Sequence, residues 1–176
     1  MLIAYLGGIR SGKSAMAQER VRVEADALAL GTPVYLGTLL SSEEAHDAGL
    51  AKRLLEHRRS RPAAWPTVEV GRDLVAAGRH CLEGGHRAWL LDGLGAWGAH
   101  FLDNPTGALH DLNAFLDLAR TLPLLVIVLD EVGLGGVPAH PAARVFADLN
   151  GALNQAVFSR VDEAIAAQAG LQLRLK

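Results

Sequence analysis

Short apolar runs alternate along the chain with longer segments in which apolar and charged residues are mixed. Uninterrupted apolar runs are typical of strands buried on both faces of a sheet, and mixed segments are typical of surface helices. The apolar runs predict strands at residues 2–6, 34–38, 67–70, 88–91 and 124–129, then two short strands, 164–166 and 171–175, around a turn at Gly170. The mixed segments predict helices at residues 14–30, 41–59, 73–82, 107–122 and 141–160.

Residues that start and stop helices support these boundaries. Ser41–Glu44 would place side-chain oxygens and negative charge at a helix N-terminus, and Gly31 and Pro62 end the helices before them. The glycine-rich segments 93–98 and 133–136 directly follow strands, so they are interpreted as loops at the sheet edge. Because strands and helices alternate throughout, we expect one α/β domain, residues 1–176, with three layers and a mostly parallel central sheet.

A phosphate-binding motif follows the first predicted strand and opens the first predicted helix. It fits G-x-x-x-x-G-K-S in full, so the expected fold is P-loop NTPase-like. The expected nucleotide-binding residues are Gly7, Gly8, Ile9, Arg10, Ser11, Gly12, Lys13 and Ser14. Glycines let successive backbone N–H groups turn toward phosphate oxygens, and the helix N-terminus favours an anion. Lys13 would bind the terminal phosphates, and the Ser14 hydroxyl would bind Mg²⁺.

Acidic residues end two of the apolar strands. Asp92 follows residues 88–91, and Asp130 and Glu131 follow residues 124–129. Ligands of open parallel sheets bind beyond the carboxyl ends of the strands, so each acid is placed to face the phosphates. We favour Asp92 as the acid on the metal side of the nucleotide, together with Ser14. The other interpretation is that these acids are exposed loop residues.

Composition narrows the class of protein. Half of the 176 residues are apolar and a fifth are charged, which is typical of a globular protein. The formal net charge of −2 provides no overall attraction for nucleic acid. The single cysteine, Cys81, leaves no partner for an intramolecular disulfide, which favours the cytoplasm. The apolar N-terminus, residues 1–6, is too short for a signal peptide, and no apolar stretch is long enough to span a membrane.

A histidine lies within a basic cluster just before Pro62. The cluster consists of Lys52, Arg53, His57, Arg58, Arg59 and Arg61. A neutral imidazole can attack phosphorus and carry the group covalently, while arginines neutralise the phosphates. Cations are also ordinary at a helix C-terminus, and the spacing alone favours that simpler interpretation.

Taken together, these segments resemble the bifunctional adenosylcobinamide kinase/adenosylcobinamide-phosphate guanylyltransferase family over nearly the whole chain. Residues 7–14 are similar to the family's G-G-x-R-S-G-K-S, and residues 57–69 to its H-R-x-x-R-P-x-x-W-x-T-V-E. Residues 130–138 are similar to its N-E-V-G-x-G-x-V-P loop, and Asn154-Gln155 and residues 170–176 also match in place. The P-loop is shared by many proteins, whereas the other two stretches are much more specific.

The resemblance implies two reactions in cobalamin assembly or salvage. A nucleoside triphosphate phosphorylates the aminopropanol hydroxyl of adenosylcobinamide, and GTP then guanylylates a histidine that passes GMP to adenosylcobinamide phosphate. It implies that His57 and Lys13 are catalytic, and that Asp92 and Glu69 lie near the nucleotide. It also implies ATP or GTP with Mg²⁺, and a homo-oligomer, specifically a homotrimer.

The chain departs from the family pattern at several places. Asp130 stands where the family usually has asparagine, Ala139 where it usually has an acid, and residues 93–100 where it commonly reads C-L-T-x-W-x-x-N. An acidic run before the histidine helix is thinned at residues 47–49. Two alternatives therefore stay open: a different P-loop small-molecule kinase without a histidine step, or a diverged nucleotide- or corrinoid-binding paralogue.

Overall fold

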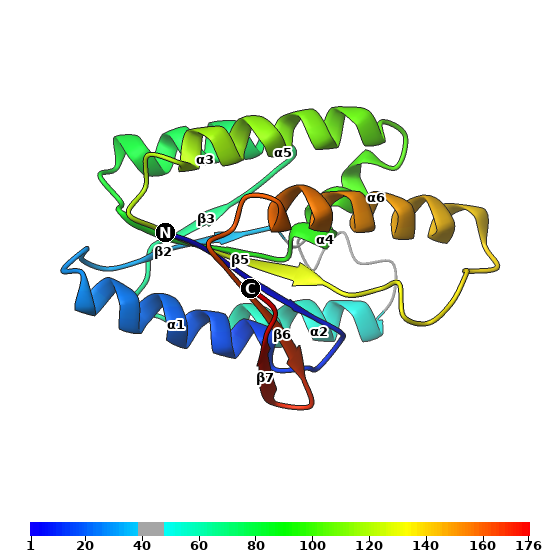
Figure 1. The fold of residues 1–176 in the computed structure, drawn as a ribbon, viewed down its shortest axis with the longest axis horizontal. Coiled ribbons are helices and arrows are strands. Elements are labelled where there is room, and N and C mark those ends of the chain that lie inside the picture. The colour runs from blue at the N-terminus through cyan, green and yellow to red at the C-terminus, as the bar shows by residue number, and fades with distance from the viewer. Residues whose placement is uncertain (39–47) are drawn as a thin grey trace.

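The computed structural model describes residues 1–38 and 48–176, and they form one seven-stranded sheet (Figure 1). The strands are β1 (Leu2–Gly7), β2 (Val34–Gly37), β3 (Thr67–Glu69), β4 (Ala88–Asp92), β5 (Leu124–Asp130), β6 (Glu163–Gln168) and β7 (Leu171–Arg174). Their order across the sheet is β3-β2-β4-β5-β1-β6-β7, and every neighbouring pair is parallel except β6 with β7. The predicted α/β class with a mostly parallel sheet is confirmed.

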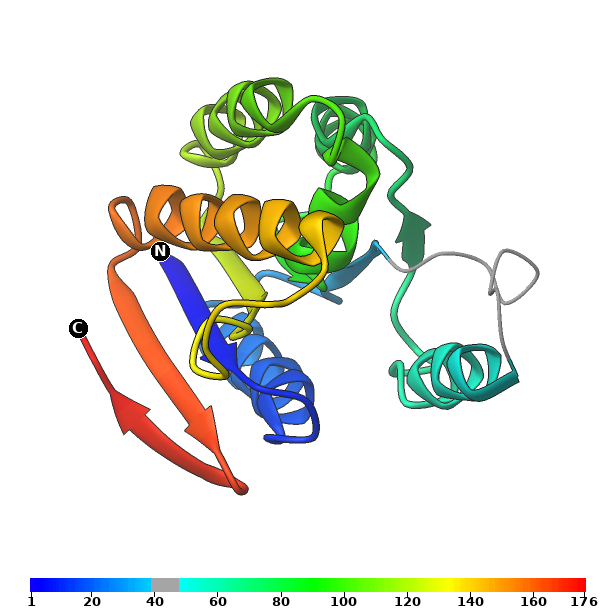
Figure 2. The same cartoon turned by 90° about the vertical axis from the view of Figure 1, so that its right-hand side faces the viewer.

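Helices cover both faces of this sheet. They are α1 (Lys13–Ala27), α2 (Ala48–Arg59), α3 (Leu74–Glu83), α4 (Leu94–Gly98), α5 (Pro105–Ala119) and α6 (Pro141–Phe158). Helices α3, α5 and α6 lie on one face and α1 on the other, and Figure 2 shows α2 set apart from this body. Residues 41–47, where the sequence predicts the start of the second helix, lie outside the described residues.

The apolar runs are buried because consecutive residues serve opposite faces. Ala4 belongs to the cluster under α3, α5 and α6, whereas its neighbours Ile3 and Tyr5 belong to the cluster against α1. Along β5 the same alternation places Ile127 in the first cluster and Val128 in the second. Both faces of the central strands are buried under helices, which explains why their sequences do not alternate between apolar and polar residues.

The interpretation of residues 93–98 as a loop is wrong, because residues 94–98 form helix α4. Gly93 makes the turn into this helix with φ of 96°. Leu94 and Trp97 are 1% and 0% exposed, so burial of their side chains stabilises the helix despite its glycines. A Cβ at Gly98 would lie 2.7 Å from the Leu153 side chain of α6, so that glycine permits close packing.

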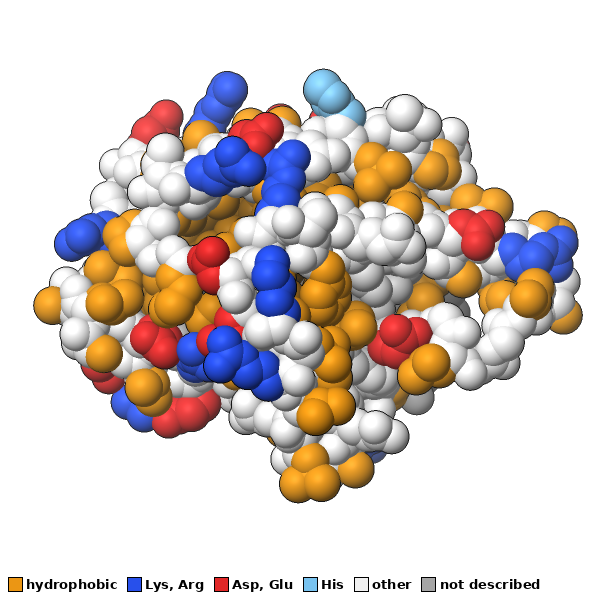
Figure 3. Space-filling model, in the orientation of Figure 1, with side chains coloured by type: hydrophobic (Ala, Val, Ile, Leu, Met, Phe, Trp, Pro, Cys, Tyr) orange, Lys and Arg blue, Asp and Glu red, His pale blue; other side chains and the backbone are white. Residues whose placement is uncertain are grey.

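The hairpin of β6 and β7 forms one side of the molecule. The two strands surround Gly170, which has φ of 80°, and they match the predicted pair of strands around this turn. All four residues of β7 are exposed, and Leu171 and Leu173 keep 74% and 64% of their surface in solvent. Figure 3 shows apolar side chains at the surface in this region. Exposed apolar side chains on an edge strand are a feature that in general favours association between chains.

Candidate active site

The carboxyl ends of five strands meet at one edge of the sheet and place the candidate residues in a row. Gly7 of β1 lies opposite Asp130 of β5. Gly37 of β2 lies between Asp92 of β4 and Glu69 of β3. The predicted phosphate loop and the predicted acids therefore share one edge, as expected for a parallel sheet.

Residues 7–14 comprise the last residue of β1, a tight loop and the first two residues of α1. Gly12 has φ of 92° and Arg10 has φ of 59°, both in the left-handed region, and the Ser11 N–H donates to the Gly8 carbonyl at 3.3 Å. A Cβ at Gly7 would lie 2.5 Å from Ser11 Oγ and 2.6 Å from the Ala167 carbonyl oxygen. Only glycine fits there, so the loop can turn back tightly over the N-terminus of α1.

Lys13 is folded back over this loop. Its ammonium donates to the Gly8 carbonyl at 3.1 Å and pairs with Asp130 Oδ1 at 3.0 Å. The Lys13 side chain is 13% exposed and that of Asp130 is 33% exposed. The lysine that would bind the terminal phosphates therefore has an internal anion as its partner.

Asp92 is the centre of a buried polar cluster. It is 2% exposed, and Ser14 Oγ donates to its Oδ1 at 3.2 Å. The Tyr35 hydroxyl donates to Oδ2 at 2.6 Å, and His57 Nε2 lies 3.3 Å from the same oxygen. One carboxylate thus connects the predicted Mg²⁺-binding serine with the predicted catalytic histidine.

This environment keeps Asp92 ionised. Burial by itself would raise the pKa of Asp92, but the hydrogen bond and charge of His57, with the Tyr35 and Ser14 hydroxyls, hold that pKa below its ordinary value. Burial, with the Asp92 charge, raises the pKa of Tyr35, so its hydroxyl stays a donor. A buried carboxylate held ionised is suited to orient a histidine or to face a cation.

The basic cluster lies beyond Asp92, at the end of α2. His57 is 26% exposed, and its Nδ1 atom is buried without a partner among the described residues. Glu69 pairs with Arg61 at 2.6 Å and with Arg58 at 3.8 Å. The structure thus places Glu69 among the arginines, on β3, which is separated from β1 by the three strands β2, β4 and β5.

The end of β5 is fixed by helix α6. Asn150 and Asn154 donate from their Nδ2 atoms to the Asp130 carbonyl at 2.7 and 3.0 Å. Glu131 continues the ladder by donating its N–H to the Gly7 carbonyl at 3.0 Å. Its Oε1 accepts from the Gly133 and Leu134 N–H groups at 2.5 and 3.2 Å, so the side chain orders its own loop.

Sequence reasoning missed Tyr35 and Asn150. Tyr35 lies within an apolar run, which signals a core residue, and its contact with Asp92 exists only because β2 and β4 are neighbours. Asn150 is 2% exposed in an otherwise amphipathic helix, and a lone buried asparagine is a weak signal for a partner.

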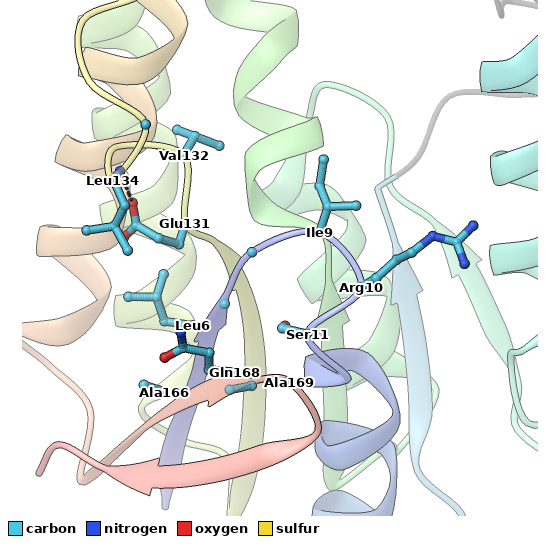
Figure 4. Close-up of a pocket in the computed structure, with 14 residues that line it drawn as sticks. Leu6, Ile9, Arg10, Ser11, Glu131, Val132, Leu134, Ala166, Gln168 and Ala169 are labelled. Atoms are coloured by element: carbon cyan, nitrogen blue, oxygen red, sulfur yellow. Dashed lines mark hydrogen bonds between the residues drawn. The ribbon is translucent and has the colours of Figure 1, made fainter.

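A mostly apolar cavity of about 520 Å³ borders the other side of the phosphate loop (Figure 4). Leu6 and Ala166 lie at its base, Ile9 comes from the loop, and Val132 and Leu134 come from the segment after β5. Ile9 and Leu134 are 79% and 91% exposed at its rim. The volume is in the range of small-molecule sites, and the exposed rim could receive part of a larger ligand.

Fold and loop together define a P-loop nucleotide-binding protein of the phosphate-transferring class. The sequence model for cobinamide kinase / cobinamide phosphate guanyltransferase matches residues 3–175. The chain belongs to this family, whose members are bifunctional kinases and guanylyltransferases of adenosylcobalamin biosynthesis.

Named relatives extend over the same length. The chain is 37% identical over 174 residues to the bifunctional adenosylcobalamin biosynthesis protein CobP of Pseudomonas aeruginosa, covering 97% of this chain and 95% of the relative. It is 29% identical over 193 residues to CobU of Salmonella typhimurium and 26% identical over 193 residues to CobU of Escherichia coli, with full coverage of both chains in each case. Within residues 1–38 and 48–176, no helix has the length and hydropathy needed to cross a membrane.

Proposed function

We propose that this chain phosphorylates adenosylcobinamide with a nucleoside triphosphate and then transfers GMP from GTP to adenosylcobinamide phosphate through His57. One observation carries the proposal: Asp92 contacts both Ser14 of the phosphate loop and His57. A histidine held at the edge of a phosphate site would be able to attack a bound nucleotide, and this proximity supports the proposal. Membership of the family supports both activities.

For the kinase step, the N–H groups of residues 8–14 would bind the phosphates and Lys13 the terminal one. Ser14 Oγ and Asp92 Oδ1 lie 3.2 Å apart and offer two oxygen ligands of the kind Mg²⁺ prefers, so these residues fit the ion. Bound there, Mg²⁺ would neutralise charge on the phosphates. The acceptor hydroxyl attacks the γ-phosphorus, the bond to the β-phosphate oxygen breaks, and the hydroxyl proton passes to solvent.

For the guanylyl step, a neutral His57 imidazole would attack the α-phosphorus of GTP, and pyrophosphate leaves. Asp92 fixes the ring and stabilises the positive charge that it acquires. Arg58 and Arg61 would neutralise the phosphates during the attack. The phosphate of the acceptor then attacks the same phosphorus, breaks the P–N bond and regenerates His57.

We place the acceptor beside the phosphate loop, in the cavity lined by Leu6, Ile9 and Leu134. Its lining is mostly apolar, and its residues Gly7 and Gly8 belong to the phosphate loop itself. The whole corrinoid is far larger than 520 Å³, so the cavity would take one arm of the substrate while the ring rests on the rim. This arrangement brings a hydroxyl on that arm to the phosphates.

The test is labelling with GTP that carries radioactive phosphorus at the α-position, followed by product analysis with adenosylcobinamide, ATP and Mg²⁺. We expect an acid-labile, base-stable label on the protein that is lost in His57→Ala. His80→Ala is the matched control, because His80 also lies in the last turn of a helix but is exposed on α3. Phosphorylated product without protein label would instead indicate a kinase that lacks the histidine step. Binding of nucleotide without either product would indicate a paralogue that has lost the chemistry.

We further propose that the protein acts in the cytoplasm as a homo-oligomer, with a trimer as the specific expectation. The exposed leucines of β7 support association, because an apolar edge strand is stabilised by a covering partner. The single cysteine, buried and free, suits a reducing compartment. Sedimentation of the purified protein tests the oligomeric state.

A further inference from the structure

The phosphate-loop lysine is already paired in this structure, and its partner is unusual for the family pattern. Lys13 Nζ lies 3.0 Å from Asp130 Oδ1. The resembling family usually has a neutral asparagine at that position. An asparagine oxygen could accept from the same ammonium, but it would bring no negative charge to the place where phosphates bind.

The surrounding structure fixes Asp130 in this position. Its backbone carbonyl accepts from Asn150 and Asn154 of α6, and its Cα is in register with Gly7, where the phosphate loop begins. The carboxylate also needs the space left by Gly95. A Cβ at that residue would lie 2.7 Å from Asp130 Oδ2 and 2.8 Å from Asn150 Oδ1.

Two departures from the family pattern therefore meet at one place. Gly95 stands where the family commonly has threonine, and its missing side chain leaves room for the carboxylate of Asp130. Gly95 does not have the positive φ that would require glycine, so space is the reason for its small size. A carboxylate that simply extended into solvent from a loop would not need space left by a neighbouring residue.

We propose that Asp130 is an internal counter-ion that holds Lys13 in the nucleotide-free site and that the terminal phosphate must displace. The inference rests on the nucleotide-binding part of the proposed function. Lys13 can pair with the carboxylate or turn to the terminal phosphate, and a carboxylate left beside that phosphate repels it. Asp130 therefore weakens the binding of triphosphates more than that of diphosphates, because Lys13 reaches the terminal phosphates.

Asp130→Asn removes the charge and keeps the shape, the backbone contacts and one acceptor oxygen. We expect triphosphate to bind about tenfold more tightly, which corresponds to a single like-charge contact at several ångströms in a partly solvated site. The affinity for diphosphate should change less, so the ratio of the two dissociation constants shifts. If Asp130 had a purely structural role, the substitution would change the affinities for both nucleotides by the same factor.

The experiment is calorimetric titration with β,γ-imido-ATP and with ADP, each with Mg²⁺ and with a chelator. Glu131→Gln is the matched control, because it removes the same negative charge one residue further along the chain. The Glu131 carboxylate accepts from the Gly133 and Leu134 N–H groups and does not pair with Lys13. Melting temperatures confirm that each variant is folded.

Selective tightening for the triphosphate in Asp130→Asn, absent in Glu131→Gln, supports the proposal. If the affinity of Asp130→Asn for the triphosphate is unchanged, the proposal is overturned, because the carboxylate then has no effect on binding. If both variants bind the triphosphate more tightly by the same factor, the proposal is also overturned, because the gain then comes from the net charge of the region. Weaker binding that appears only with Mg²⁺ also overturns it, because Asp130 would then bind the metal–nucleotide complex. If the wild-type chain binds neither nucleotide, the proposed function itself fails, which is distinct from binding that the substitution leaves unchanged.

Discussion

Replacing Asp92 by asparagine tests the centre of the site. The carboxylate is 2% exposed and receives three groups: Ser14 at 3.2 Å, Tyr35 at 2.6 Å and His57 at 3.3 Å. Asparagine keeps one oxygen for Tyr35 and His57, and the Ser14 hydroxyl can rotate to accept from the new amide. What is lost is the negative charge in a buried place, with little change in shape.

The magnitude follows from these contacts. Hydrogen bonds to a charged group contribute roughly 1.5–3 kcal/mol and neutral ones about 1 kcal/mol, while removing the carboxylate relieves its desolvation. We expect a net loss of about 2 kcal/mol in the free energy of unfolding, or roughly 4–8 °C in melting temperature for a chain of this size. Guanylylation of His57 should slow by about 10- to 100-fold, because the ring loses its orienting anion.

The stability difference should also depend on pH in a defined direction. The pKa of Asp92 is lowered in the folded state, so the carboxylate stabilises the fold fully above its ordinary pKa of 3.8. This stabilisation is lost as the pH falls through the lowered pKa. The stability gap between wild type and Asp92→Asn should therefore be full at about pH 7 and close in strong acid. Urea unfolding across this pH range measures it, with Tyr35→Phe as a control that removes one donor and keeps the charge. Equal stability at neutral pH, or a gap that widens toward acid, would refute the reasoning.

Two further substitutions test neighbouring parts of the site. Gly95→Ala places a Cβ 2.7 Å from Asp130 Oδ2, so we expect the free energy of unfolding, measured by thermal unfolding, to fall by about 1–3 kcal/mol. Gly135→Ala is the control: a Cβ there meets nothing within 4 Å, so the stability should stay close to that of the wild type. Leu134→Asn makes the cavity rim polar, so the KM for adenosylcobinamide should rise by about tenfold while the Kd for ATP stays within twofold; the assignment of the acceptor to this cavity fails if the KM is unchanged.

The fold was predictable where burial leaves a direct pattern. The run 124–129 is apolar because both faces of β5 are covered, and the same holds for β1 and β4. Helix positions were close, although α1 ends at Ala27, before the predicted residue 30. The short helix α4 was not predictable, since its glycines signal a loop and only the packing of Leu94 and Trp97 against other elements overrides them.

The candidate site was predictable only in its separate parts. The phosphate loop is contiguous in sequence, and the acids follow strands, so their common edge could be inferred from a parallel sheet. The contacts of Asp92 could not, because they need the strand order that sets β2 beside β4 and the position of α2 beyond them. The same is true of Lys13 and Asp130, which are joined only through the pairing of β1 with β5.

Because Asp92 contacts both Ser14 and His57, the kinase and guanylyltransferase steps would depend on the same phosphate loop. The sequence contains a single G-x-x-x-x-G-K-S loop, so under the proposed function Lys13 and Ser14 would hold one triphosphate at a time. If His57 receives its guanylyl group from a nucleotide in that loop, the kinase donor must leave before GTP binds. The two steps then alternate on each chain, and ATP should slow guanylylation by competing for the loop, even in the absence of cobinamide. Labelling that is insensitive to excess ATP would mean that the guanylyl donor occupies a separate phosphate site.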